Sequence, residues 1–225
     1  MRKIFFLLTA FFSIAHAKTP LEIQEFKKEI VHTVLSMEGW CSEEKAVAFI
    51  DLILELKPET CVEIGVFAGR SFFPVVSTLK FLGSGIAMAV DPWDKVECLK
   101  YLDPTGDQAH MKWWGKLNMD HLYYLFLNTL RQYDLKSHAL VMKATSEKAA
   151  PAIGIIDFLY LDGNHSEIMA TRDVELYLPK VRSGGIVCIN DTQWSEMQPA
   201  LDIVVEKCNL VQLIDNGNAI IFRKK

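Results

Sequence analysis

The chain has 225 residues, half of them apolar, which is enough for one globular domain with a single well-packed core. Its formal net charge is −4, and its longest basic run is the closing Arg223-Lys224-Lys225. Nucleic-acid-binding surfaces need a basic patch, so the composition disfavours RNA and DNA and favours a small-molecule partner. The five cysteines have no metal-ligand spacing, and we expect core thiols rather than a disulfide framework.

The first seventeen residues have the pattern of a signal peptide. After a basic start, residues 4–15 are almost wholly apolar, and Ala15-His16-Ala17 is a small-x-small cleavage site. The run is too short for an ordinary membrane-spanning helix. We predict cleavage after Ala17, export to the periplasm or the outside, and a mature single domain of residues 18–225 without a stable membrane partner. The alternative is an uncleaved segment that anchors the protein to the membrane.

Two helices are expected before the first strand, covering the domain on its N-terminal side. Between residues 20 and 35, apolar residues recur at intervals of three and four, the spacing of one helix face. Ser42, followed by two glutamates, predicts the N-cap of a second helix that runs to about Leu56. Lys57-Pro58-Glu59 should end this helix, because proline disrupts a helix interior.

The stretch from Cys61 to Phe73 predicts a strand, a glycine turn and a helix entered at Ser71. Gly65 and Gly69 allow a tight turn and a close approach to a ligand, and the helix start offers free N–H groups to an anion. Glu63 places a carboxylate beside this turn, which suits a cationic amino group and disfavours a pyrophosphate. We therefore expect a ligand that carries both charges.

The second strand, residues 86–90, is closed by Asp91. A carboxylate at this place can accept hydrogen bonds from both hydroxyls of a ribose, although a simple strand-end turn is an alternative. Residues 92–116 are the least regular part of the chain and contain Trp93, Trp113 and Trp114. These tryptophans form either a lid over a planar or sugar-like substrate or part of the packing.

Two later strands end in carboxylates. The strand 155–161 leads into Asp162 and His165, and a turn at 182–185 is expected to lead into the strand 186–189, which ends before Asp191. The carboxyl ends of strands in open α/β sheets carry their chemistry, so these residues should form one site. Two carboxylates can hold Mg²⁺, and His165 can act as a general base because its usual pKa lies near neutrality. The alternative is that Asp162 and Asp191 only cap the helices that follow them and that His165 is a surface-loop residue.

Repeated strand–helix units predict an α/β fold, a doubly wound, Rossmann-like parallel sheet with helices on both faces. Near the end, residues 211–214 and 219–223 read as two strands joined by a tight loop. Three βα units in a row carry this prediction.

The order Glu63-x-Gly65-x-x-x-Gly69-x-Ser71 resembles motif I of class I S-adenosylmethionine-dependent methyltransferases, closest to the catechol and caffeoyl O-methyltransferase branch. The phrase from Asp162 to Asp191-Thr192 is similar to small bacterial cephalosporin-type and sugar O-methyltransferases. The resemblance covers about residues 40–223. It implies a mostly parallel seven-stranded sheet with an antiparallel last strand, and a methyltransferase acting on a small hydroxylated molecule.

The resemblance also implies a site for S-adenosylmethionine. The residues that it assigns to this cofactor are Glu63, Gly65, Gly69, Ser71, Asp91, Thr145 and Ser146. Glu63 and Ser71 would hold the methionine end, and either Thr145 or Ser146 would contact the adenine. Ser146 could equally cap the helix that follows it.

In the metal-dependent branch, the counterparts of Asp162 and Asp191 hold Mg²⁺, with an Asn after the second Asp and a Lys three residues after the first. This chain has Thr192 and His165 at those places. The sequence therefore leaves two mechanisms open, one with Mg²⁺ bound by Asp162 and Asp191, and one with His165 as a metal-free base. If the protein self-associates, we expect a homodimer.

Two other functions compete with the methyltransferase. A nicotinamide-dependent oxidoreductase is disfavoured because the glycine turn lacks Gly-x-Gly and Glu63 would repel a pyrophosphate. An exported binding or interaction protein on a degenerate methyltransferase fold is the second competitor. The signal peptide supports it, since S-adenosylmethionine is made in the cytosol, whereas the intact Glu63, Gly65 and Asp91 speak against decay.

Overall fold

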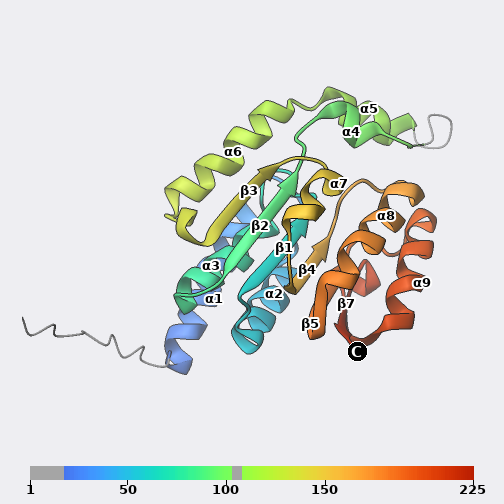
Figure 1. The fold of residues 1–225 in the computed structure, drawn as a ribbon. Helices are drawn as coiled ribbons and strands as arrows, with labels where there is room; N and C mark the ends of the chain where they lie inside the picture. The colour runs from blue at the N-terminus through green and yellow to red at the C-terminus, as the bar shows by residue number, and fades with distance from the viewer. Residues whose placement is uncertain (1–17, 103–107) are drawn as a thin grey trace, which may run out of the picture.

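The computed structural model describes residues 18–102 and 108–225 (Figure 1). The predicted signal peptide, residues 1–17, lies outside the described residues. Among the helices that are described, none is long and apolar enough to cross a membrane.

One seven-stranded sheet forms the centre of the molecule, in the order β3-β2-β1-β4-β5-β7-β6. Its strands are β1 Thr60–Ile64, β2 Ile86–Asp91, β3 Ala139–Lys143, β4 Ile156–Leu161, β5 Val181–Ile189, β6 Cys208–Ile214 and β7 Ala219–Lys224. The first five strands pair in parallel, and β7 runs antiparallel to both β5 and β6. The predicted doubly wound, mostly parallel sheet with an antiparallel last strand is confirmed.

Helices cover both faces of this sheet (Figure 1). They are α1 Pro20–Ser36, α2 Glu43–Leu56, α3 Phe72–Leu82, α4 Lys95–Leu99, α5 Gln108–Lys116, α6 Met119–Gln132, α7 Ser146–Ala149, α8 Glu167–Tyr177 and α9 Gln198–Lys207. Strand side chains alternate between two cores. Cys61 and Phe158 pack with α1, α2, α3 and α6, whereas Val62 and Leu159 pack with α7, α8 and α9.

The two N-terminal helices begin as their sequences predict. Thr19 and Glu22 form a reciprocal capping box at the start of α1, and Ser42 accepts a hydrogen bond from the backbone N–H of Lys45 at the start of α2. Helix α2 ends at Leu56, and its C-cap Lys57 adopts a left-handed conformation before Pro58. This covering layer on one face of the sheet was therefore predictable from caps and periodicity.

Two predicted irregular segments are regular in the structure. Residues 92–116 contain α4 and α5, and Asp94 caps α4 by accepting from two backbone N–H groups. The turn predicted at 182–185 is part of β5, which begins at Val181. Gly185 lies so close to β4 that a Cβ atom there would be 3.0 Å from the carbonyl oxygen of Asp157, at a register shift between the strands. The glycine therefore serves strand pairing and does not end the strand.

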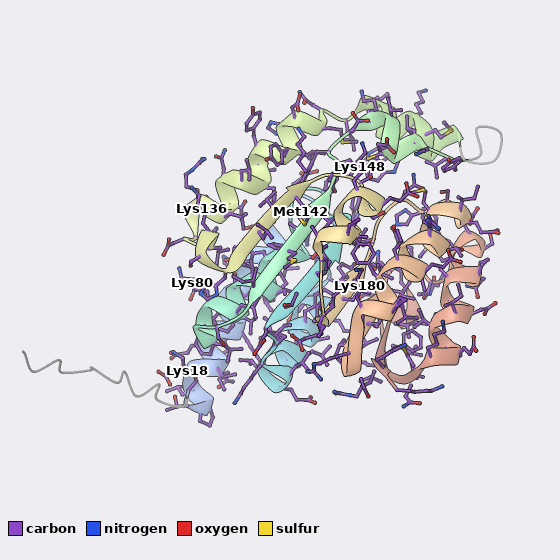
Figure 2. The ribbon with its side chains drawn as sticks, in the orientation of Figure 1. Lys18, Lys80, Lys136, Met142, Lys148 and Lys180 are labelled. Carbon is purple, nitrogen blue, oxygen red and sulfur yellow. The ribbon has the colours of Figure 1, made fainter. Side chains whose placement is uncertain are left out.

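The cysteines and most lysines lie where their chemistry predicts, whereas Lys45 does not. All five cysteines are free thiols and four are buried, which confirms their predicted role in the core. Lys80, Lys136 and Lys148 are exposed, and the first two lie at the edge of the molecule in Figure 2. Lys45, in contrast, is only 3% exposed and points into the centre of the molecule beside the carboxyl ends of the strands.

Candidate active site

A cavity of about 780 Å³ lies at the carboxyl ends of β1, β2, β4 and β5. This is the place where open α/β sheets bind ligands, and the volume is within the range of small-molecule sites. The predicted residues that line it are Gly65, Ser71, Asp91, Thr145, Ser146, Asp162, His165 and Asp191. The sequence therefore identified residues from five segments that the fold brings to a single cavity.

The two glycines of the loop after β1 have left-handed backbones, with φ of +82° at Gly65 and +86° at Gly69. A Cβ atom at Gly65 would lie 2.0 Å from the carbonyl oxygen of Asp162, and one at Gly69 would lie 2.4 Å from the ring of Phe126. Both positions therefore require glycine for contacts within the protein. Gly65 also lines the cavity, whereas Gly69 supports the loop from behind.

Glu63 and Ser71 form a buried pair behind the glycine loop. The Ser71 hydroxyl donates to Glu63 Oε1 at 2.6 Å, and Glu63 Oε2 is buried with no hydrogen-bond partner among the described residues. Burial raises the pKa of Glu63 well above its usual range, although the bond from Ser71 opposes this shift. A buried acceptor without a donor fits a ligand ammonium group. Ser71 lines the cavity, and Glu63 lies next to it.

Asp91 closes β2 and holds the glycine loop. Its Oδ2 accepts from the backbone N–H groups of Val66 and Phe67, each at 2.9 Å, and its Oδ1 accepts from that of Trp93 at 2.6 Å. Burial raises the pKa of Asp91, and these three bonds oppose that effect. A carboxylate offers about four acceptor positions, so about one is left for a ribose hydroxyl. Asp91 thus has a loop-shaping role that the sequence did not indicate.

Thr145 and Ser146 have different roles at the start of α7. Thr145 is the N-cap, and its hydroxyl accepts from the backbone N–H of Lys148 at 3.4 Å. Ser146 is the first helical residue and is 6% exposed, so the interpretation of Ser146 as a cap is wrong. The hydroxyl group of Ser146 therefore remains the better candidate for a contact with the adenine.

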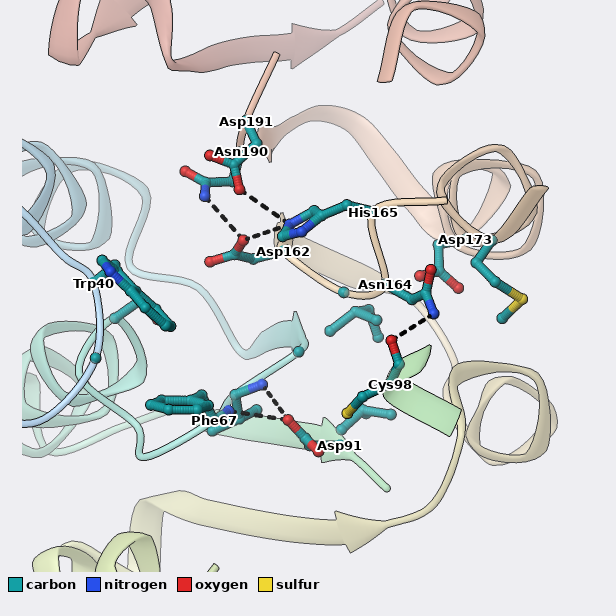
Figure 3. Close-up of a pocket in the computed structure, with 18 of the residues that line it drawn as sticks. Trp40, Phe67, Asp91, Cys98, Asp162, Asn164, His165, Asp173, Asn190 and Asp191 are labelled. Carbon is teal, nitrogen blue, oxygen red and sulfur yellow. Dashed lines mark hydrogen bonds and ion pairs between the residues drawn. The ribbon is translucent and has the colours of Figure 1, made fainter. Parts of the chain in front are cut away.

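Asp162, His165 and Asp191 converge at one corner of the cavity (Figure 3). His165 Nε2 lies 3.0 Å from Asp191 Oδ2 and 3.6 Å from Asp162 Oδ1. Burial would lower the pKa of His165, but its hydrogen bonds with both carboxylates outweigh burial and raise that pKa to about 9. The usual near-neutral pKa of histidine, on which the general-base hypothesis rests, therefore does not apply to His165 in this arrangement. At neutral pH the imidazole keeps its proton and joins the two carboxylates.

Further polar side chains fix the two carboxylates, and the sequence did not identify them. Tyr160 donates its hydroxyl to Asp162 Oδ2 at 2.8 Å, and Asn190 donates to Asp162 Oδ1 at 2.9 Å. Asn218, next to β7, donates to Asp191 Oδ1 at 3.2 Å. Asp162 and Asp191 are thus oriented by bonds within the site, and the alternative that they only cap the following helices is not needed to explain them.

Lys45 brings a second positive charge to this network. Its Nζ lies 2.5 Å from Asn190 Oδ1 and 3.4 Å from the Tyr160 hydroxyl, and it lines the cavity. The residue comes from α2, far upstream of the strand ends. Its position four residues before Phe49, on the buried face of that helix, is the sequence signal that could have found it. A lysine on an otherwise apolar face needs a buried partner.

Aromatic side chains surround the other side of the cavity. Trp40 is 58% exposed, and its ring centroid lies 5.1 Å from those of Phe67 and Trp113. Trp93, by contrast, is 3% exposed, donates its indole N–H to the Phe67 carbonyl and packs on Phe126. For Trp93 the packing interpretation is correct. Trp113 and Trp114 line the cavity, as does Trp40, which the sequence analysis did not single out.

The described donor set is suited to a hard cation. Asp162, His165 and Asp191 can each offer one ligand atom, and these atoms lie within 4.8 Å of one another. Oxygen-rich sites with a free side toward a cavity suit Mg²⁺. The same three residues, without an ion, are held together by ion pairs from His165 to both carboxylates, so the mechanism with Mg²⁺ and the mechanism with His165 as base both stay predictions.

Comparison with known proteins agrees with this geometry. A family model described as a methyltransferase domain matches residues 62–192. No curated protein sequence gives a significant match. The O-methyltransferase NovP superposes with a TM-score of 0.70 at 14% identity, over 91% of this chain and 98% of NovP.

Two further solved structures share the fold. PaMTH1, a methyltransferase from Podospora anserina solved with S-adenosylhomocysteine, has a TM-score of 0.62 at 11% identity, over 89% of this chain and 88% of its own. TomG, an O-methyltransferase from Streptomyces achromogenes solved with S-adenosylmethionine, has a TM-score of 0.59 at 10% identity, over 95% and 93%. The family model, the strand order and the cavity agree: the chain belongs to the methyltransferase domain family and has the Rossmann-like fold of class I methyltransferases.

Proposed function

We propose that this methyltransferase transfers the methyl group of S-adenosylmethionine to a hydroxyl group of a small molecule. The observation that carries the proposal is the buried Glu63 Oε2, which has no donor among the described residues and lies beside a glycine loop at the cavity. An ammonium group there would supply the missing donor. Asp91 can still accept from one ribose hydroxyl, and Ser146 can contact the base.

S-adenosylmethionine supplies an electrophilic methyl group on a sulfonium. The acceptor oxygen forms the new bond to this methyl carbon as the carbon–sulfur bond breaks, and its proton must leave. The cavity walls orient the acceptor, and the polar cluster receives the proton. Asp162 and Asp191 would hold Mg²⁺, which lowers the pKa of a hydroxyl group bound to it.

His165 contributes to catalysis in a way that depends on its proton. With a pKa of about 9 it is an imidazolium in the described arrangement, and it can accept the proton of the acceptor only after losing its own. Binding of Mg²⁺ by Asp162 and Asp191 would weaken the ion pairs that keep the imidazole protonated. A role for His165 as a base and a role for Mg²⁺ are therefore compatible with each other.

The acceptor class that the cavity favours is planar. Trp40, Phe67 and Trp113 present ring faces and edges to the cavity, and such rings bind flat molecules through stacking. Phenols and catechols therefore take precedence over aliphatic alcohols, with sugars next because they also stack on tryptophan. Export of the mature protein stays part of the proposal and rests on the predicted signal peptide alone.

Isothermal titration of the mature protein tests the proposal. We expect binding of S-adenosylmethionine and S-adenosylhomocysteine but not of NAD, because a carboxylate at Glu63 favours an ammonium and disfavours a diphosphate. Absence of binding to either sulfur nucleoside at millimolar concentration would refute it and favour an interaction protein on a degenerate fold. A Glu63→Gln variant should bind more weakly, because the amide keeps the bond from Ser71 but removes the negative charge.

A further inference from the structure

Asp173 is a buried carboxyl group that the proposed reaction does not use. It belongs to α8, is 5% exposed and lines the cavity at the end opposite Trp40 (Figure 3). Its Oδ1 is buried with no hydrogen-bond partner among the described residues. A buried carboxyl oxygen without a donor is unfavourable, so its presence in a ligand cavity calls for an explanation.

Among the described residues, no cation lowers the pKa of Asp173. Burial raises this pKa to about 7, a hydrogen bond with Ser146 opposes the effect, and the carboxylate of Glu147 adds to it. A core carboxyl normally has an Arg or Lys partner, as Asp157 has in Arg182. The missing donor must therefore come from the contents of the cavity, and it need not be charged.

The position of Asp173 identifies the part of the cofactor that it faces. The glycine loop with Ser71 would hold the methionine end and Asp91 the ribose, so the base lies beyond Asp91, toward Ser146. Asp173 shares a hydrogen bond with Ser146, and its Oδ2 would be 3.0 Å from a Cβ atom at Gly163. The absence of a side chain at Gly163 gives the carboxyl group its place at the cavity wall.

The same end of the cavity has suitable walls for a flat base. Met169 and Cys98 line it, and their sulfur atoms are polarisable groups that pack well on aromatic rings. Asn164 holds the segment of Cys98 in place, because its side-chain amide donates to the carbonyls of Glu97, Cys98 and Lys100 at 2.9 to 3.2 Å. This end of the cavity therefore has walls that are held in place by hydrogen bonds, with the carboxyl group of Asp173 at its edge.

We propose that Asp173 is a specificity-determining residue that accepts a hydrogen bond from the exocyclic amino group of adenine. The inference rests on the proposed function, because it assumes that the cavity holds the adenosyl group. Adenine presents this amino donor at its edge, whereas hypoxanthine presents a carbonyl acceptor there. Two acceptors facing each other repel, so the site would reject the deaminated base.

The test compares S-adenosylhomocysteine with S-inosylhomocysteine by isothermal titration at pH 8.5, where a carboxyl group of pKa about 7 is ionised. We expect the wild-type protein to bind the adenine compound at least about tenfold more tightly, the range of one well-formed base-edge pair. Asp173→Asn can turn its amide N–H₂ toward the carbonyl of hypoxanthine. This variant should therefore gain affinity for S-inosylhomocysteine, to within about threefold of its affinity for S-adenosylhomocysteine.

Glu175→Gln, an equal charge change on the exposed face of α8, is the matched control and should keep the wild-type ratio. Should Asp173→Asn not fold, Asp173→Ser serves in its place, since a hydroxyl can both donate and accept. Equal binding of the two compounds by the wild type, or an unchanged ratio in the Asp173 variant, would overturn this inference while leaving the proposed function intact. No binding of S-adenosylhomocysteine by the wild type would instead overturn the proposed function.

Discussion

Replacing Gly65 by alanine should both destabilise the fold and disrupt the cofactor site. The backbone of residue 65 is left-handed, with φ of +82°, and placing alanine in this conformation costs about 1–2 kcal/mol of folding free energy. Its Cβ atom would also lie 2.0 Å from the carbonyl oxygen of Asp162, so the ends of β1 and β4 would have to separate by about 1 Å. That movement weakens the 2.9 Å hydrogen bond from the Asp162 N–H to the Ile64 carbonyl. With about 1 kcal/mol for this bond and about 1–3 kcal/mol for the overpacking, we expect a total loss of about 3–6 kcal/mol.

Gly83 provides a control with the same backbone and no clash. Its φ is +75° at the end of α3, and a Cβ atom there would meet nothing within 4 Å. Gly83→Ala should therefore lower the free energy of unfolding by only about 1–2 kcal/mol, as measured by urea denaturation. S-adenosylhomocysteine affinity should fall in Gly65→Ala and stay unchanged in Gly83→Ala. Equal losses of stability in the two variants would show that contact between β1 and β4 does not explain the glycine.

Three further outcomes follow from the site, the buried carboxyl and the N-terminus. Asp191→Ala should remove activity and leave S-adenosylhomocysteine affinity nearly unchanged, and a chelator should have the same effect on the wild type. Activity is measured as transfer of label from the cofactor to a panel of catechols, phenols and sugars. Full activity of Asp191→Ala would rule out the metal, and activity that resists chelation but is lost in His165→Ala would assign the chemistry to the histidine. Asp173 keeps its proton in the folded protein up to a pKa of about 7, against an ordinary aspartate pKa of 3.8, so its contribution to stability should decline by about 4 kcal/mol as pH rises from 4 to 8. Urea unfolding at several pH values should show this decline in the wild type relative to Asp173→Asn, and parallel curves would contradict it. Mass spectrometry of protein from its own cells should find Lys18 as the first residue; an intact membrane-bound chain would favour the anchor, and an intact soluble chain would refute export.

Local signals in the sequence were sufficient for most of the fold. The caps at Thr19 and Ser42 and the alternation of strands with helices identified elements whose structure depends on nearby residues. The glycines at 184 and 185 were misleading, because their composition favours a turn, whereas β5 pairs with β4 on both sides of them, at Val181 and at Ile186, and so includes them. Helices α4 and α5 were missed, since segments of five and nine residues are too short for the periodicity of apolar residues to identify a helix.

The candidate site shows the same division between local and distant effects. Asp162, His165 and Asp191 follow strands, so topology alone places them at one edge. The pKa of His165 depends on two carboxylates at 3.0 and 3.6 Å from its Nε2 atom. Distances of this kind cannot be inferred from the spacing of residues in the sequence. Asp173 was missed because its position in the middle of α8 resembles any helical aspartate until its burial is known.

The contacts of Lys45 and Asn218 bear on how the protein can be divided. The family model spans residues 62–192, yet Lys45 reaches the network from upstream of that span, and Asn218 reaches Asp191 from downstream. An expression fragment cut to the matched region would keep the glycine loop and the carboxylates. It would lack the cation beside Asn190 and the amide that orients Asp191, and β5 would have an open edge where β7 belongs. A fragment for biochemical work or grafting must therefore include at least α2 through β7.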